Sequence, residues 1–125
     1  MKLGTLVDPR FKSAIAKLQN APLSLKTAFK LRGLVKAIEK ELTTYEETRQ
    51  AALNKYGKKN EDGSLLTLGE NKNVQFDEGQ YELFFEELRE LAALEVDLPQ
   101  LDAADLGNIT VSADDLAMLE ELIKI

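Results

Sequence analysis

A chain of 125 residues that is 44% hydrophobic, 30% charged and 6% aromatic has the size of one domain with one core. It contains no cysteine, which excludes disulfides, thiolate zinc sites and cysteine nucleophiles, and no histidine, the commonest general base and metal ligand. We therefore expect residues 1–125 to form a single, non-catalytic domain without a cofactor. No apolar run approaches the roughly 18 residues of a membrane-spanning helix, and Met1–Asp8 lacks a signal peptide's apolar stretch, so we expect no membrane association.

The charges are divided unevenly along the chain. Residues 1–59 contain 13 Lys and Arg against 5 Asp and Glu, a net charge of +8, whereas residues 60–125 contain 3 against 17, a net charge of −14. Opposite charges of this kind can orient two halves within one fold or join one copy of a chain to another. Because nucleic-acid binders are normally basic and this chain carries a net charge of −6, direct nucleic-acid binding is disfavoured.

The first predicted helix begins near residue 9. Asp8 is a typical N-cap residue, and Pro9 suits the first helical position. Apolar residues then recur at the spacing of one helical face: Phe11, Ala14, Ile15 and Leu18. We expect this helix to end at Asn20 and the preceding segment, Met1–Val7, to be a strand or a tail.

The longest predicted element is a helix from about residue 24 to residue 56, with Gly57 just beyond its end. Residues along it follow alternating steps of four and three, the heptad pattern of a coiled coil: Leu31, Val35, Ile38, Leu42, Tyr45, Arg49, Ala52 and Tyr56. We call these eight residues the heptad stripe. A helix this long needs a partner for its apolar stripe, either another helix of this chain or a second copy. Leu42 and Tyr45 are candidate interaction residues in the second case.

Two residues of the long helix depart from the pattern. Arg49 lies on the heptad stripe, where its side chain either extends to solvent or forms a register-setting ion pair with a carboxylate of the acidic half. Gly33 weakens the helix by about 1 kcal/mol relative to alanine, and we expect it to mark a close helix crossing.

Turn signals after the long helix predict a small β-hairpin over about residues 64–76. Asp62-Gly63 precedes it, and the segments Ser64–Leu68 and Asn73–Phe76 flank a polar turn. Asp77 is then expected to cap a third helix that extends to about Leu94. Its apolar residues repeat at helical spacing: Tyr81, Phe84, Phe85, Leu88, Leu91 and Ala92.

The remaining chain is predicted to be irregular around Pro99 and then helical again. Asp102–Leu106 suits one helical turn, and Ser112 followed by Asp115 suits the cap of a last amphipathic helix. The predicted fold class is therefore mainly α, a helical bundle or hairpin built on one long helix, with a minor β-hairpin.

Three carboxylates, Glu82, Glu86 and Glu90, are spaced four apart and form a row on the third helix. The row is most simply a solvated face, because a metal site needs ligands from more than one element. A regular row of carboxylates could also imitate the phosphates of DNA and occupy the basic groove of a nucleic-acid enzyme.

The long helix carries a basic counterpart to this row: Lys26, Lys30, Arg32, Lys36 and Lys40. These cations could contact an acidic partner or phosphates. Pairing with carboxylates of the same chain is the simpler interpretation.

Several short sequences occur in a characteristic order. They are Leu18–Lys26, Glu41-Leu42 with Tyr45, Glu46 and Arg49, Lys55-Tyr56-Gly57, Asp62-Gly63, Glu86-Glu87-Leu88 and Glu95–Pro99. In this succession the chain resembles a family of small, mostly uncharacterised proteins encoded by tailed bacteriophages and prophages, over most of residues 10–125. The resemblance implies a phage origin and a helical architecture, and it transfers no catalytic or binding residue.

Two functional hypotheses follow. The first is a non-catalytic protein–protein interaction module of a phage, acting in virion assembly or as a structural accessory, with a phage protein, a host protein or a second copy as partner. Its candidate interaction residues are Leu42, Tyr45 and Arg49. The alternative is an inhibitor of a host enzyme or defence system that acts through the acidic C-terminal half, with Glu82, Glu86 and Glu90 as contacts. Either protein would be found in the bacterial host cytoplasm, and the first also in the virion.

Overall fold

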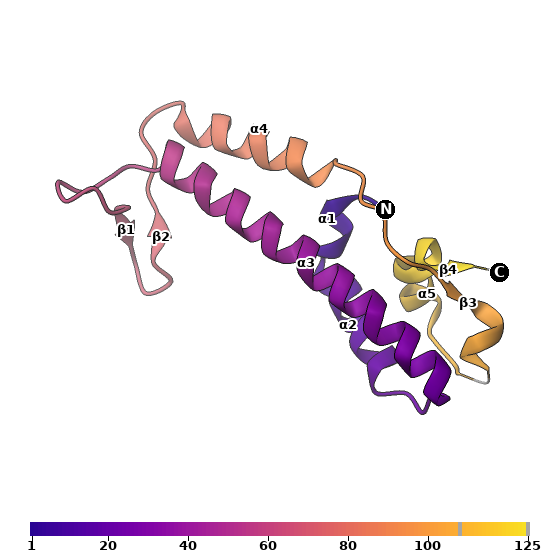
Figure 1. The fold of residues 1–125 in the computed structure, drawn as a ribbon. Helices are drawn as coiled ribbons and strands as arrows, with labels where there is room; N and C mark the ends of the chain where they lie inside the picture. Colours follow the sequence, from indigo (N-terminus) through magenta and orange to yellow (C-terminus); the bar gives the residue numbers. More distant parts are fainter. Residues whose placement is uncertain (108, 125) are drawn as a thin grey trace.

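The computed structural model describes residues 1–107 and 109–124, and Figure 1 shows it as a mainly helical molecule with two very short sheets. In chain order the elements are α1 (Leu3–Leu6), α2 (Pro9–Gln19), α3 (Leu25–Tyr56), β1 (Thr67–Leu68), β2 (Asn73–Val74), α4 (Gln80–Ala92), β3 (Leu101–Asp102), η1 (Ala103–Leu106), α5 (Ala113–Leu119), η2 (Glu120–Leu122) and β4 (Ile123–Lys124). The predicted fold class, mainly α with a minor β-hairpin on one long helix, is confirmed. In the described part of the chain, no helix combines the length and apolarity needed to cross a membrane.

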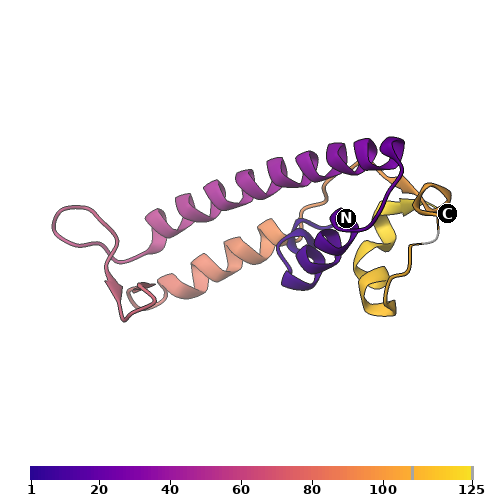
Figure 2. The same cartoon turned by 90° about the horizontal axis from the view of Figure 1, so that it is seen from below.

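Helix α3 is the axis of the molecule. It extends for 32 residues, which at 1.5 Å per residue is roughly 48 Å, and continues through Gly33. Ser24 caps it, because its Oγ accepts a hydrogen bond from the backbone N–H of Thr27 at 3.2 Å. Helix α4 lies antiparallel along the C-terminal part of α3, and α1, α2 and α5 gather around its N-terminal part (Figures 1 and 2).

Two separate hydrophobic clusters hold these helices to α3. The larger cluster joins α1, α2, α3, β3 and the C-terminal elements through its buried residues: Leu3, Leu6, Phe11, Ala14, Ile15, Leu18, Leu31, Leu34, Ile38, Leu101, Leu119 and Leu122. The smaller cluster joins α3 to α4 and the hairpin through the buried residues Ala52, Leu53 and Phe84. Each large apolar side chain buried in this way contributes about 1.5–3 kcal/mol to folding.

The predicted β-hairpin is present and shorter than its expected range. Strands β1 and β2 pair antiparallel over two residues each, with Thr67 opposite Val74. Gly69 and Lys72 both have positive φ angles, of 84° and 51°, which the tight four-residue turn between the strands requires.

Some segments differ from their predicted structure. Met1–Val7 contains the short helix α1 instead of a strand or tail, because Leu3 and Leu6 turn into the larger cluster. Helix α4 begins at Gln80, and Gly79 with a φ of 82° occupies the N-cap position that was expected for Asp77. The parallel pair of β3 and β4 was not predicted.

Gly57 follows the end of α3, as expected, without the left-handed turn that a glycine often forms there. Its backbone is extended, with φ −68° and ψ 145°, which any residue can adopt. A Cβ at this position would lie 2.6 Å from the Leu53 carbonyl oxygen and 2.6 Å from Leu65 Cδ2. Glycine is therefore needed here for close packing between the end of α3 and the hairpin.

Substituting alanine for Gly33 and for Gly57 should change the stability of the fold in opposite directions. A Cβ at Gly33 would meet nothing within 4 Å, so the expected close crossing is not made within the chain, and Gly33→Ala should raise the free energy of unfolding by about 0.5–1 kcal/mol. Gly57→Ala should lower it by about 1–3 kcal/mol through steric crowding. Urea unfolding followed by circular dichroism measures both, and a destabilising Gly33→Ala would contradict the exposed position of Gly33.

An ion pair between α2 and α5 should make the stability of the fold depend on pH in the acidic range. The Asp115 side chain is largely buried, and Lys17 Nζ donates to its Oδ2 at 2.8 Å. This hydrogen bond lowers the pKa of Asp115 against the opposing effect of burial. Because the folded pKa lies below the unfolded one, the ion pair stabilises the fold above the unfolded pKa of about 3.9, and that stability is lost as pH falls through the folded pKa.

Asp115→Asn should therefore lower the unfolding free energy at neutral pH, and its difference from the unsubstituted protein should shrink below about pH 4. The control is Asp114→Asn, which removes an exposed neighbouring carboxylate. Thermal unfolding at a series of pH values measures both. Equal pH dependence in the two variants would show that Lys17 does not stabilise the fold.

Candidate functional site

The outer side of the first turns of α3 carries two large, highly exposed apolar side chains. Leu25 is 89% exposed and Phe29 is 80% exposed. At 100° per residue, Arg32 and Lys36 fall on the same side of the helix, opposite the buried Thr27 and Leu31. We call Leu25, Phe29, Arg32 and Lys36 the basic patch.

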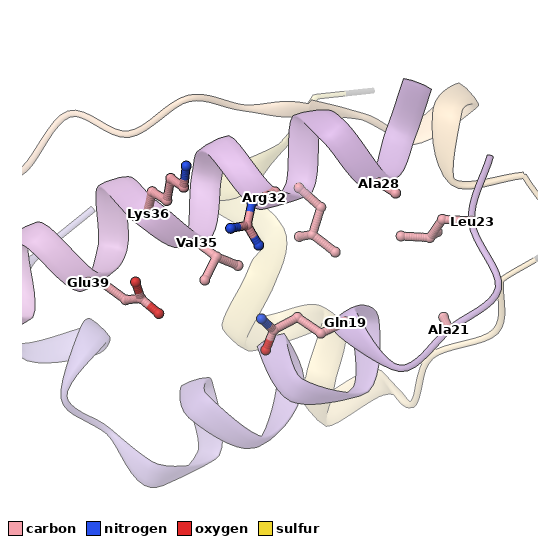
Figure 3. A pocket seen from close by; sticks show the side chains of 9 residues that line it. Gln19, Ala21, Leu23, Ala28, Arg32, Val35, Lys36 and Glu39 are labelled. Carbon is pink, nitrogen blue, oxygen red and sulfur yellow. The ribbon is translucent and has the colours of Figure 1, made fainter. Parts of the chain in front are cut away.

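An open groove of about 550 Å³ lies directly beside the basic patch, between α3 and the end of α2 (Figure 3). Its lining residues are Gln19, Ala21, Leu23, Ala28, Leu31, Arg32, Val35, Lys36 and Glu39. Buried Leu31 and half-buried Val35 give it apolar surface. At 100° per residue, Arg32 and Lys36 fall between this surface and Phe29. The groove therefore extends the basic patch toward α2 as one continuous surface.

The predicted pairing of the basic cluster within the chain is realised at Lys30. Lys30 Nζ donates to Asp105 Oδ2 at 2.8 Å, which raises the pKa of Lys30 and lowers that of Asp105. Thr27 Oγ1 adds a hydrogen bond to the Asp105 carbonyl oxygen at 2.9 Å. Within residues 1–107 and 109–124, Arg32 and Lys36 form no ion pair with this chain, so their charges remain available on the surface.

The predicted carboxylate row is present at the opposite end of the molecule. Glu82, Glu86 and Glu90 are all exposed on α4, and we call them the acidic face. Glu86 Oε1 accepts a hydrogen bond from Arg89 at 2.7 Å, whereas Glu82 and Glu90 take part in no ion pair with the described residues. No group of three Asp or Glu side chains able to hold a metal ion occurs in the described ranges.

Glu87, which was not among the predicted site residues, fixes α4 against α3. Its Oε1 accepts hydrogen bonds from the Tyr56 hydroxyl at 2.7 Å and from Lys55 Nζ at 3.3 Å. These two donors, Tyr56 first, lower the pKa of Glu87. Glu82 and Glu86 lie about 140° and 100° around α4 from Glu87 and are exposed.

Aromatic side chains adjoin the acidic face. Tyr81 and Phe85 are 53% and 52% exposed, and their rings stack with centroids 6.2 Å apart. Phe76 connects them to the core, since its ring lies edge-on to Tyr81 at 5.5 Å and stacked on Phe84 at 5.3 Å. The apolar side of α4 is thus wider than the surface of α3 that covers it, and two rings remain at the solvent boundary.

The heptad stripe of α3 is covered by the protein's own chain. Leu42 and Tyr45 are partly buried against the larger cluster, and Tyr56 packs against the smaller one. Arg49 donates a hydrogen bond to Glu46 Oε1 at 3.2 Å on the same helix, so it forms no register-setting pair with the acidic half among the described residues. Of the two partners considered for the stripe, these contacts favour this chain over a second copy.

Neither a known protein family nor a curated protein or solved structure matches this chain. The inference about function therefore depends on the two exposed surfaces, the basic patch and the acidic face with its aromatic rings.

Because Leu42 and Tyr45 pack within the chain, we expect their replacement to destabilise the fold without changing its oligomeric mass. Substituting both by alanine should lower the free energy of unfolding by about 2–5 kcal/mol, because packing against the larger cluster is lost. Light scattering coupled to gel filtration should give the same mass as for the unsubstituted protein. Thr43→Ala, an exposed neighbour, is the control. A reduced mass at unchanged melting temperature would instead make the stripe an interface.

Proposed function

We propose that this chain is a non-catalytic protein–protein interaction module of a tailed phage, acting in virion assembly or as a structural accessory. The observation that carries the proposal is the near-complete exposure of Leu25 and Phe29. These side chains lie on a helix whose opposite side is buried, so they are presented rigidly and are not covered by any other described residue. Contiguous exposed apolar side chains rimmed by polar ones are typical of interaction sites.

The basic patch also has the composition of an interface centre. Aromatic residues and arginine are enriched at such centres, and Phe29 and Arg32 are neighbours on one helical face. Because α3 is fixed by the larger cluster, binding would order little additional backbone. The groove next to Arg32 and Lys36 offers further apolar surface to a bound side chain.

The charges of the patch define the chemistry of the partner. Arg32 and Lys36 are four residues apart, and neither is neutralised by a carboxylate in the described part of the chain. A partner that supplies apolar side chains together with carboxylates fits this surface. Binding should then weaken as the salt concentration rises, because exposed charges are screened over about 10 Å at 0.1 M salt.

We infer the phage setting from the resemblance to tailed-phage proteins over most of residues 10–125, and with it a location in the bacterial host cytoplasm or in the virion. The alternative function, an inhibitor of a host enzyme or defence system, is favoured by a different observation. Glu82 and Glu90 are exposed on one helix without an ion pair in the described ranges, as a mimic of DNA phosphates requires.

Affinity capture from phage-infected cells at low and high salt tests both functions. The bait proteins are the unsubstituted chain, a basic-patch variant, Phe29→Ala with Arg32→Glu, and an acidic-face variant, Glu82→Lys with Glu90→Lys. The control variant, Leu116→Ala with Lys12→Glu, makes matched changes at exposed positions of α5 and α2.

We expect phage structural proteins to be captured by the unsubstituted and control proteins, and at least about tenfold less by the basic-patch variant, since interface anchors contribute 1.4 kcal/mol or more. Capture of a host nuclease, polymerase or defence protein that is lost only in the acidic-face variant would favour the inhibitor. Capture unaffected by the basic-patch variant would contradict the proposed function.

A further inference from the structure

The basic patch and the acidic face lie at opposite ends of α3. Leu25 and Phe29 are on its first two turns, whereas α4 packs on its last turns through Ala52 and Leu53. Figure 1 shows the start of α4 at the far end of the molecule from the start of α3. Lys36, the last residue of the basic patch, and Thr48, which lines a groove together with Glu90, are 12 residues apart on α3, roughly 18 Å, so the basic patch cannot reach the acidic face of the same molecule.

The two surfaces match in kind and in spacing. Leu25 and Phe29 are four residues apart, and so are Tyr81 and Phe85. Arg32 and Lys36, four apart, correspond to Glu82 and Glu86 with opposite charge. On α3 the charges follow the apolar pair along the helix, whereas on α4 they lie beside it, about 100° around the helix, and Glu86 is also bound by Arg89. Each surface thus combines two large exposed apolar side chains with two charges, and the sign of the charges is opposite.

The overall charge of the two ends permits their contact. Residues 41–94, which include α4 and the hairpin, contain 12 acidic and 6 basic residues, a net charge of −6. The remaining residues contain 10 of each and are neutral together. The end with the basic patch therefore carries no net charge that would repel a second molecule's acidic end, and Arg32 and Lys36 supply positive charge on its surface.

We propose that the partner of the basic patch is a second copy of this chain, whose Tyr81, Phe85 and acidic face dock head to tail onto Leu25, Phe29 and Arg32. This inference rests on the proposed function and names the partner. The contact joins two different surfaces, so a bound pair of molecules still offers one free basic patch and one free acidic face. Repetition of the contact generates a ring or a growing chain, as expected of a structural component of an assembly.

The proposed contact between two copies is small, so we expect it to be weak and to form only at high protein concentration. Two short helical faces form an interface below the roughly 1,000 Å² of stable complexes, which corresponds to weak association. Exposed ion pairs strengthen it only modestly and are weakened by salt. The measurement accordingly needs low salt and protein concentrations up to the millimolar range.

Two blocked variants test the arrangement by complementation. The first, Phe29→Ala with Arg32→Glu, removes the basic patch and keeps the acidic end. The second, Phe85→Ala with Glu82→Lys, removes the acidic end and keeps Tyr81, whose ring contacts Phe76. All four residues are exposed, so circular dichroism and melting temperature should be close to those of the unsubstituted protein. Leu116→Ala with Lys12→Glu is again the matched control.

Sedimentation velocity and light scattering then measure the masses. We expect the average mass of the unsubstituted and control proteins to rise beyond a dimer with concentration, and each blocked variant alone to remain a monomer. An equimolar mixture of the two variants should form a dimer and nothing larger, because each contributes one intact surface. High salt should weaken that dimer about five- to tenfold, as the loss of two exposed ion pairs predicts.

A dimer formed by either blocked variant alone would overturn the head-to-tail arrangement, and so would a mixture that stays monomeric. A monomeric unsubstituted protein at all concentrations would overturn self-association itself. In that case the proposed function still stands if the basic-patch variant loses its captured phage proteins. If that capture is unaffected while complementation succeeds, the patch serves self-association alone.

Discussion

Burial of one side of α3 is the constraint on which the rest of the structure depends. A helix of 32 residues with an apolar stripe is not stable alone in water, so the remaining chain must cover it. Two groups of elements do so, one around Leu31, Leu34 and Ile38 and the other around Ala52 and Leu53. Both groups approach from the same side, and the uncovered side becomes the surface on which Leu25 and Phe29 stand. One side of α3 thus packs in the core, and the other side carries the exposed residues proposed to bind a partner.

Elements whose ends are decided by nearby residues could be predicted from the sequence. Asp8 caps α2 through the Arg10 N–H, and Ser112 caps α5 through the Asp115 N–H, as their local patterns indicated. Elements that depend on distant partners were missed. The N–H of Leu3 donates to the Leu94 carbonyl oxygen, and that of Val96 donates to the Met1 carbonyl oxygen, both at 2.8 Å. No short window of sequence contains both partners of these bonds.

The candidate site was only partly predictable for a related physical reason. The exposed carboxylate row was identified, since charged residues on a helix are mostly solvated. The heptad stripe drew attention to Leu42 and Tyr45, which pack within the chain, and away from Leu25 and Phe29. The available signal was a pair of apolar residues four apart on the side opposite the stripe, next to Arg32. Which of two apolar stripes is covered depends on tertiary packing, and the periodicity of one helix does not contain that information.

The unequal size of the two clusters makes the two ends of the molecule open at different rates. Only Ala52, Leu53 and Phe84 are fully buried in the smaller cluster, whereas the larger one unites residues from both ends of the chain. Segments with few buried contacts separate from the remainder at a lower free energy than global unfolding. The start of α4 and the hairpin can therefore detach from α3 while the other end stays closed, and their backbone amides exchange hydrogen with solvent sooner. The end of α4 is held more firmly, because Leu91 packs against the larger cluster. The aromatic rings beside the acidic face thus lie in the part of the protein that opens most easily. Phe29 lies on the part of α3 that the larger cluster holds in place.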